Sequence, residues 1–240
     1  MLNRLHRRSF SMYLAGSLLA ATNALPAAAG PGLPPTFEGL VKVESKKLAA
    51  VYLLPGADFH RYTKIMLDPV QVSFQKGWMQ DMKRTRDISR RIDNEDAQRI
   101  ADAVRSGVGD IFATAFKSKG YVVVTAPAPD VLRVSVGVVN LYINAPDPMG
   151  GAAITRTYTV EAGEATLSLE ARDSTTGALL GVAVDRRATR NTGRLQFTSS
   201  VSNRSDFEEL FKRWANICVN GLEELKARPP LRGPQGEKAR

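Results

Sequence analysis

Apolar residues recur every three or four positions in two long stretches of the chain, residues 95–118 and residues 207–225. This spacing places the apolar side chains along one side of an α-helix. The first helix has suitable end signals, because Asp93 or Asn94 is positioned to cap its first turn and Gly120 to end it. The chain is therefore expected to contain two amphipathic helices, each with one face to bury.

The second helix carries the chain's single cysteine on its apolar stripe. Ser205 and Glu208 have the spacing of a capping box, which predicts that this helix begins at Ser205. Trp214 and Cys218 lie on the stripe that follows. Trp214 is expected to be buried against a sheet. Cys218 is expected to be buried as well, because a lone exposed thiol is a liability in an oxidising compartment.

Elsewhere the apolar residues follow the shorter period of β-strands. Strands are predicted over residues 49–54, 62–74, 121–125, 132–143, 165–171 and 180–184. Pro69 divides the second of these into two short strands or bends it. The 121–125 run is apolar almost throughout, as in an interior strand. Within residues 132–143 the apolar positions change from even to odd numbers, which predicts a β-bulge near residues 137–139.

The order of these elements predicts an α+β fold. We expect a two-layer sandwich in which a mostly antiparallel sheet of about five strands is covered by the two amphipathic helices. A turn is predicted over residues 173–177 and loops over residues 145–157 and 186–204. Residues 75–91 are polar and basic and are expected to form a loop with some helix.

The first 29 residues have the layout of a cleavable signal peptide. Three arginines near the start precede an apolar run of about 14 residues and then a small-residue segment that ends at Ala29. The run is shorter than the ~20 residues that span a bilayer. Cleavage is expected after Ala29, with Ala27 as the alternative. Arg7 and Arg8 resemble a twin-arginine signal, so the general secretory and twin-arginine routes both stay open.

Cleavage there would leave a single α+β domain over residues 30–228, followed by a disordered tail over residues 229–240. No cysteine lies near the cleavage point to carry a lipid, so a free periplasmic protein is expected. The formal net charge is +9, and removal of the three signal arginines leaves +6 (9 − 3). This excess is compatible with peripheral contact with an anionic membrane surface, and also with ordinary solvated surface charge.

Residues that commonly carry catalysis are sparse. The histidines are His6, within the signal, and His60. One cysteine and one mature histidine cannot form a zinc cluster, and the motifs of nucleophile elbows and phosphate-binding loops are absent from the sequence. The acidic run at residues 93–96 is better explained by helix-start chemistry than by ion binding. We therefore assign no catalytic, cofactor-binding or metal residues, and we expect no enzyme activity and no cofactor.

Two sets of residues are candidates for an interaction surface. Basic residues within 83–91 and 186–194 would form a patch if the fold brought them together, although solvated loops explain them equally well. Aromatic residues are not interleaved with them, so nucleic acid is not an expected partner. Tyr142, Tyr158 and the loop at residues 149–151 form the second set, which would suit a partner or a ligand.

Three segments resemble a known bacterial family: Gly39–Val43, Ala50–Asp58 and Tyr62–Val70. They are similar to domain of unknown function 3313, whose members are mostly small envelope proteins and often lipoproteins. The similarity extends over most of the mature chain, to about Leu225. The resemblance implies a place in the cell envelope and brings no catalytic residues. The lipid-attachment cysteine is missing here, so the anchor is not carried over.

These observations favour a non-catalytic periplasmic envelope protein, a binding or assembly module that docks to an envelope protein partner. The element order also resembles the small sandwich domains of transporter-auxiliary lipoproteins and of outer-envelope assembly proteins, which is an analogy of fold. One alternative is a carrier of a lipid or small ligand, which needs an apolar cavity of roughly 300 Å³ or more. Another is an undetected hydrolase, which needs a deep pocket around His60 or a carboxylate pair.

Overall fold

The computed structural model describes residues 36–37, 39–85, 92–144, 157–159, 162–189, 196–198 and 200–230. All of them belong to one compact unit, Gly32–Arg240. In chain order the elements are β1 (Thr36–Phe37), β2 (Leu40–Val43), β3 (Ala50–Leu53), β4 (Lys64–Leu67), β5 (Gln71–Phe74), α1 (Trp78–Thr85), α2 (Asn94–Ser118), β6 (Val122–Val123), β7 (Val131–Ile143), β8 (Thr157–Thr159), β9 (Gly163–Asp173), β10 (Leu179–Ala188), β11 (Gln196–Thr198) and α3 (Ser200–Lys226). None of the described helices combines the length and apolarity needed to cross a membrane.

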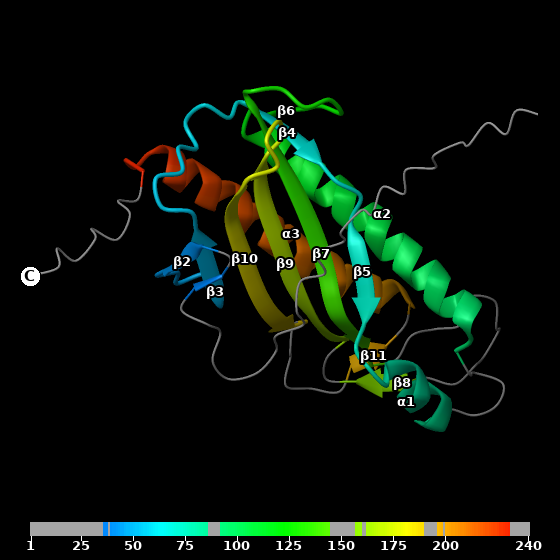
Figure 1. The fold of residues 1–240 in the computed structure, drawn as a ribbon. Helices are drawn as coiled ribbons and strands as arrows, with labels where there is room; N and C mark the ends of the chain where they lie inside the picture. Colours follow the sequence, from blue (N-terminus) through cyan, green and yellow to red (C-terminus); the bar gives the residue numbers. More distant parts are fainter. Residues whose placement is uncertain are drawn as a thin grey trace, which may run out of the picture. The chain divides into compact units, whose positions relative to one another are not determined.

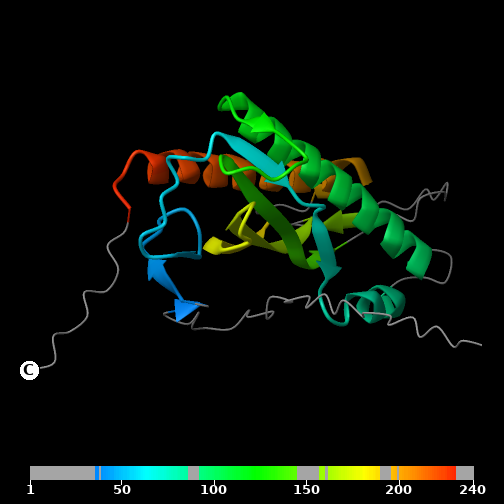
Figure 2. The ribbon, with the colours of Figure 1, turned by 45° about the horizontal axis from the view of Figure 1, so that its top comes forward.

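A sheet of nine strands forms one layer of the fold. Its strand order is β1-β2-β3-β10-β9-β7-β4-β6, and β5 also pairs with β7. Both long helices, α2 and α3, lie on the same side of this sheet (Figures 1 and 2). They pack against each other, and α2 also contacts β4, β5 and β6. A separate two-stranded sheet pairs β8 with β11.

The α+β class is confirmed, but the prediction of a mostly antiparallel sheet of about five strands is wrong. From β1 to β7 the neighbouring strands run antiparallel, whereas β4 and β5 both pair with β7 in parallel, as does β6 with β4. The parallel pairs arise because the 25-residue helix α2 lies between β5 and β7 in the chain. A crossover of that length returns the chain in the same direction. The short strands β1 and β2 have no clear alternation in the sequence.

The predicted bulge in the central strand exists, a few residues beyond its expected place. The register of β7 with β9 shifts between Val139 and Tyr142, and Asn140 has a positive φ of 51°. Before the shift the even-numbered residues, such as Val138, are buried, and after it the odd-numbered Leu141 and Ile143 are buried. The change of apolar phase in the sequence therefore reports a real irregularity of the strand.

The first long helix has the end signals that the sequence predicts. Asp93 is its N-cap, and its carboxylate accepts the backbone N–H of Asp96 at 2.8 Å. The Asp96 carboxylate accepts the backbone N–H of Asp93 in return, at 3.2 Å, which completes a capping box. Gly120 follows the helix with a φ of 86°, a conformation that glycine adopts without strain. This part of the prediction is confirmed, and it accounts for the acidic run.

The predicted start of the second helix is wrong. Helix α3 begins at Ser200, so Ser205 is already inside it. Glu208 therefore does not close a capping box, and its carboxylate instead lies 3.8 Å from Arg204 and 3.7 Å from Lys212, each one turn away. A capping motif is a short local pattern, and here the helical backbone continues upstream over residues 200–204.

Three other expectations need correction. The apolar run at 121–125 forms the two-residue strand β6 at the edge of the sheet, where Val122 is 56% exposed, rather than an interior strand. The region 186–204, expected to be a loop, contains the end of β10, all of β11 and the start of α3. Thr157 belongs to β8 rather than to a loop. The expected strand 62–74 is the pair β4 and β5, as predicted.

Several predicted segments lie outside the described residues. These are the signal peptide, the glycine-containing loop at residues 149–151, the basic residues 86–91, and the tail from residue 231 onward. The described part of the tail, residues 229–230, has no regular secondary structure.

The strands bury side chains on both faces of the sheet. The main core lies between the sheet and the helices. A smaller cluster on the opposite face joins Leu40, Ala50, Tyr52 and Val182. Because successive strand residues alternate between faces, the positions of β10 that face α3 are the neighbours of Val182. Those neighbours are small residues, and this leaves space beneath the helix.

Candidate binding cavity

An apolar cavity of about 250 Å³ lies between the second half of α3 and the sheet. Side chains of β3, β7, β9 and β10 form its floor, and α3 forms its roof from Ile217 to Leu225. Phe59 and Phe116 close one side, and the segment from Val43 to Leu48 closes another. Most of these lining groups are hydrocarbon, so the cavity suits an apolar guest.

Small residues on both sides of the gap create the cavity. Gly181 and Ala183 line it from β10, and Gly221 lines it from α3. A Cβ added at Gly221 would have nothing within 4 Å, whereas one added at Gly181 would lie 3.0 Å from the Leu53 side chain. The free space is therefore on the helix side, next to Gly221. A larger residue at that position is the direct way to fill the cavity.

The single cysteine lies on the wall of this cavity. Cys218 is partly buried rather than fully buried as predicted, because it packs against the main core and also lines the cavity. Burial, and then the nearby Asp185 carboxylate, raise the pKa of the Cys218 thiol to about 12. The thiol is therefore protonated at neutral pH and adds to the apolar lining rather than serving as a nucleophile.

Charged residues are confined to the mouth of the cavity. Lys47 Nζ donates to Glu224 Oε1 at 2.8 Å, which links the 43–48 segment to α3. The hydrogen bond from Lys47, followed by its charge and that of Arg228, lowers the pKa of the Glu224 carboxyl. Glu44 and Arg228 also line the mouth. The mouth thus carries two basic and two acidic side chains, whose formal charges cancel.

A buried carboxylate fixes the elements around the cavity. Asp185 Oδ1 accepts the Ala49 N–H at 3.0 Å, and its Oδ2 accepts Trp214 Nε1–H at 2.8 Å and the Arg187 guanidinium. These bonds join β10, the segment before β3, and α3 at one point. Trp214 has no exposed surface, so its predicted burial against the sheet is confirmed.

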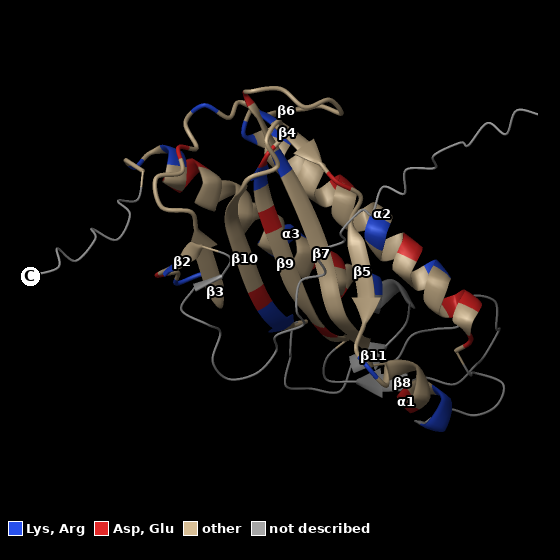
Figure 3. Cartoon of the chain, in the orientation of Figure 1, with Lys and Arg blue, Asp and Glu red and all other residues tan. Residues whose placement is uncertain are grey.

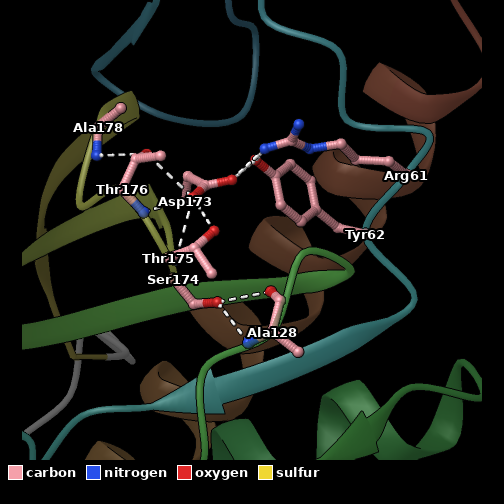
Figure 4. A network of polar contacts seen from close by, with 8 residues as sticks. All are labelled: Arg61, Tyr62, Ala128, Asp173, Ser174, Thr175, Thr176 and Ala178. Atoms are coloured by element: carbon pink, nitrogen blue, oxygen red, sulfur yellow. Dashed lines mark hydrogen bonds and ion pairs between the residues drawn. The ribbon is translucent and has the colours of Figure 1, made fainter.

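A second buried carboxylate, Asp173, organises the far end of β9 (Figure 4). One of its oxygens accepts the N–H and hydroxyl groups of Thr175 and Thr176, and the other accepts Tyr62 Oη–H at 2.9 Å and the Arg61 guanidinium. The Thr175 hydroxyl and the Thr176 N–H are the main reasons that the pKa of Asp173 lies well below its usual range. With both oxygens occupied, this group stabilises a turn and is unavailable as a base.

His60 lies in an exposed loop away from the cavity. Its Nδ1 lies 2.8 Å from Asp58 Oδ1, two residues earlier in the same loop. Among the residues that the structure describes, no three histidine, cysteine or acidic side chains are grouped so as to hold a metal ion.

The structure does not gather the predicted basic set into one patch within its described ranges. Arg186 pairs with Glu164, Arg187 with Asp185, and Arg84 with Asp81. Figure 3 shows basic and acidic residues interspersed along the helices and strands. Arg190 and Arg194 lie outside the described residues. Each of the three pairs therefore neutralises a basic residue locally.

The aromatic set is not assembled either. Tyr142 is half-buried on β7, Tyr158 belongs to β8, and the loop between them is not described. In the described part of the chain, the large apolar residues exposed at the surface are Val41 and Val122. Val122 lies at the β6 edge of the sheet and Val41 near the opposite edge, so they do not form a joint apolar patch.

The cavity was not predicted from the sequence, although the small residues that create it are visible there. Gly221 interrupts the second helix on the turn after Cys218, and Gly181 and Ala183 occupy one face of β10. Small residues facing each other across a helix–sheet interface leave space unless a neighbour fills it. Which positions face each other depends on the tertiary fold. The cavity can therefore be recognised only after β10 and α3 have been placed.

Comparison with solved structures finds distant similarities in fold. The PelC dodecamer from Paraburkholderia phytofirmans is 11% identical, with a TM-score of 0.33, over 68% of this chain and 96% of that one. Protein XCC0632 from Xanthomonas campestris, of family DUF330, is 8% identical, with a TM-score of 0.34, over 72% and 88%. A putative neuraminyllactose-binding hemagglutinin homologue from Helicobacter pylori is 10% identical, with a TM-score of 0.29, over 71% and 86%. Similarity this distant carries no argument about function.

Sequence comparison is more decisive. No curated protein matches the chain. A family model described as "Protein of unknown function (DUF3313)" matches residues 32–217, which is well over half of the 240 residues. The match confirms the resemblance seen in the sequence, and it covers the sheet and α3 as far as residue 217, short of the expected end near Leu225. The chain belongs to the DUF3313 family.

Proposed function

We propose that this protein is a non-catalytic binding module of the cell envelope, exported to the periplasm, and that its binding site is the cavity beneath α3. The observation that carries the proposal is the apolar cavity of about 250 Å³, with its charged groups confined to the mouth. A cavity of that composition favours retention of an apolar group over chemistry on a polar one.

The proposal includes no catalytic role because of the states of three reactive groups that the structure describes. Cys218 carries a raised thiol pKa of about 12, and both oxygens of Asp173 are engaged by hydrogen bonds. His60 is exposed and away from the cavity. None of these groups is arranged with a second residue as nucleophile and base.

The sequence favours docking to an envelope protein over carriage of a ligand. The cavity favours ligand binding instead. Its volume is slightly below the expected threshold, yet it is the described feature best suited to binding. An envelope protein that delivers or accepts the bound molecule stays part of the proposal. Gentle cross-linking in the periplasm, followed by identification of the attached protein, is the way to find it.

The binding role is tested by native mass spectrometry of protein purified from its own periplasm. The wild type is expected to carry a bound molecule, and Gly221→Leu is expected to lose it because the leucine fills the cavity. Gly107→Leu is the matched control, since an added Cβ at this α2 position also has nothing within 4 Å and Gly107 does not line the cavity. Bare wild-type protein, or equal loading of all three proteins, would overturn the proposal.

A further inference from the structure

We infer that the cavity takes the single unbranched hydrocarbon chain of an amphiphile, with an anionic head group at the mouth beside Lys47 and Arg228. This inference rests on the proposed function and names the class of molecule that the same site binds. The proposed ligand is a fatty acid or a single-chain phosphate, rather than a two-chain lipid, a sterol or a peptide.

The size of the cavity limits it to one chain. Its volume of about 250 Å³ exceeds the ~150 Å³ of an engineered apolar cavity that binds benzene, and it is below the ~300–1,000 Å³ of sites for drug-sized ligands. A guest between these two sizes is a single hydrocarbon chain of moderate length, and the rest of a longer chain would extend into solvent.

The chemistry of the walls favours hydrocarbon over a polar guest. Apart from the charged residues at the mouth, the lining includes hydrocarbon groups such as Val51, Val134, Leu222 and Phe116. Cys218 adds a neutral thiol there, because its pKa is raised. A sugar or a peptide backbone would have to leave water without finding hydrogen-bond partners in that region, which is costly. A methylene chain has no such groups to satisfy.

Lys47 and Arg228 offer an anionic head group two basic partners at the mouth. Glu44 and Glu224 also line it, so its formal charges cancel, and the head group would replace Glu224 beside Lys47. The Lys47–Glu224 pair is about half exposed on both sides, and exposed ion pairs contribute little to stability. A carboxylate or phosphate head group can therefore replace Glu224 as the partner of Lys47 with little loss of stability.

The first experiment measures the affinity of a series of straight-chain carboxylates, from hexanoate to tetradecanoate, by isothermal titration calorimetry below their micelle concentrations. Each added methylene is expected to tighten binding about fourfold until the cavity is full. The gain should then stop within the series. No binding, or affinity that rises evenly across the whole series as in surface adsorption, would overturn the inference.

The matched glycine variants show whether the chain enters this cavity. Gly221→Leu should weaken decanoate binding at least tenfold, and the smaller change Gly221→Ala should weaken it less. Gly107→Leu should bind as the wild type does. Thermal unfolding confirms that each variant is folded, and Gly221→Ala keeps the test decisive if the leucine variant is not. Equal affinities for folded wild type and folded Gly221 variants would place the ligand elsewhere.

The head-group part has its own test. Lys47→Gln and Arg228→Gln should each weaken decanoate binding about three- to tenfold and leave decanol unchanged, because decanol carries no charge. Decyl phosphate should behave like decanoate, which tests the shared anionic chemistry. Decyltrimethylammonium binding as tightly as decanoate would overturn the assignment of an anionic head.

The single cysteine supplies an independent readout. Because Cys218 is the only thiol in the chain and lines the cavity, its alkylation by iodoacetamide at alkaline pH, where more of it is thiolate, reports on occupancy. Decanoate should slow alkylation at least tenfold at saturation, and urea should remove the protection. One outcome is that Gly221→Leu loses, in native mass spectrometry, the molecule that co-purifies with the wild type, while no alkyl ligand binds or protects Cys218. In that case the inference fails and the proposed binding site stands.

Discussion

At the scale of single residues, two buried carboxylates connect segments that are far apart in the chain. Asp173 ties the turn after β9 to the loop that carries Arg61 and Tyr62. Asp185 ties β10 to α3 through the Trp214 indole. Buried acidic groups are costly unless they are fully hydrogen-bonded, and both of these are. Substitution of either residue should therefore lower the free energy of unfolding markedly.

The first prediction concerns Asp173. Its folded-state pKa is lowered, so the stability it contributes is present above the unfolded pKa of about 3.9 and is lost as pH falls toward the folded value. Asp173→Asn should lower the free energy of unfolding by roughly 3 kcal/mol at pH 7. That difference from wild type should shrink as pH falls below about 4, as measured by urea denaturation.

Asp102 provides the control for this measurement. It pairs with Arg105 on the exposed side of α2. Asp102→Asn should change the free energy of unfolding by less than about 0.5 kcal/mol, because surface ion pairs contribute little. A difference between wild type and Asp173→Asn that stays constant from pH 7 to pH 3 would contradict the assigned role of Asp173.

The second prediction concerns Trp214, which has no exposed surface and donates to Asp185 at 2.8 Å. Trp214→Ala should cost about 3–5 kcal/mol through lost packing. Trp214→Phe keeps much of the ring volume but removes the N–H donor, and it should cost about 1–3 kcal/mol. Chemical denaturation of both variants separates the two contributions. A cost below about 1 kcal/mol for Trp214→Ala would mean that α3 is not docked on the sheet.

At the scale of elements, the central strand β7 contains the most specific irregularity. The bulge places Asn140 at a positive φ of 51° and brings the Tyr142 carbonyl against Gly163 of β9. A Cβ at Gly163 would lie 1.9 Å from that carbonyl oxygen. The bulge and the glycine opposite it therefore form one unit, since the bent strand needs a partner without a side chain.

The third prediction tests that unit. Asn140→Gly should leave the free energy of unfolding nearly unchanged, because glycine adopts positive φ without strain. Asn140→Val should cost about 1–2 kcal/mol, because a β-branched residue is strained in that conformation. Thermal denaturation of the pair provides the comparison. Equal stabilities for the valine and glycine variants would mean that the positive φ does not persist in solution.

The elements differ in how much of them local sequence specifies. The capping box at Asp93 and the apolar stripe of α2 act within a few residues, and both predictions are confirmed. The false capping box at Ser205 is also local, and there the helix continues upstream of it. Short strands such as β1 and β6 have weak patterns, because pairing with a neighbour rather than local preference stabilises them.

At the scale of the whole molecule, β7 joins the two halves of the sheet. The antiparallel strands β9, β10 and β3 lie on one side of it, and the parallel strands β4 and β5 lie on the other. The cavity lies mainly over the antiparallel half, where small residues of β10 face α3. The site therefore depends on packing between elements as far apart in the chain as β3 and α3.

The fourth prediction concerns the whole chain and its export. Mass spectrometry of the protein from the periplasm should show a first residue of Gly30, from cleavage after Ala29. Replacement of both Arg7 and Arg8 by lysine should block export if the twin-arginine route is used and leave it intact if the general route is used. Protein that keeps residues 1–29 and stays in the cytoplasm of wild-type cells would contradict the assigned address.

The amino-acid sequence is enough to predict the α+β class, the two amphipathic helices, the bulge in the central strand and the family. These features depend on periodicity and on short-range capping and turn chemistry, which act within a few neighbouring residues. The tertiary structure decided the size and mixed direction of the sheet, the second apolar cluster around Tyr52, and the cavity. Those depend on which faces meet, and a glycine at 181 or 221 leaves open space only after β10 and α3 have come together.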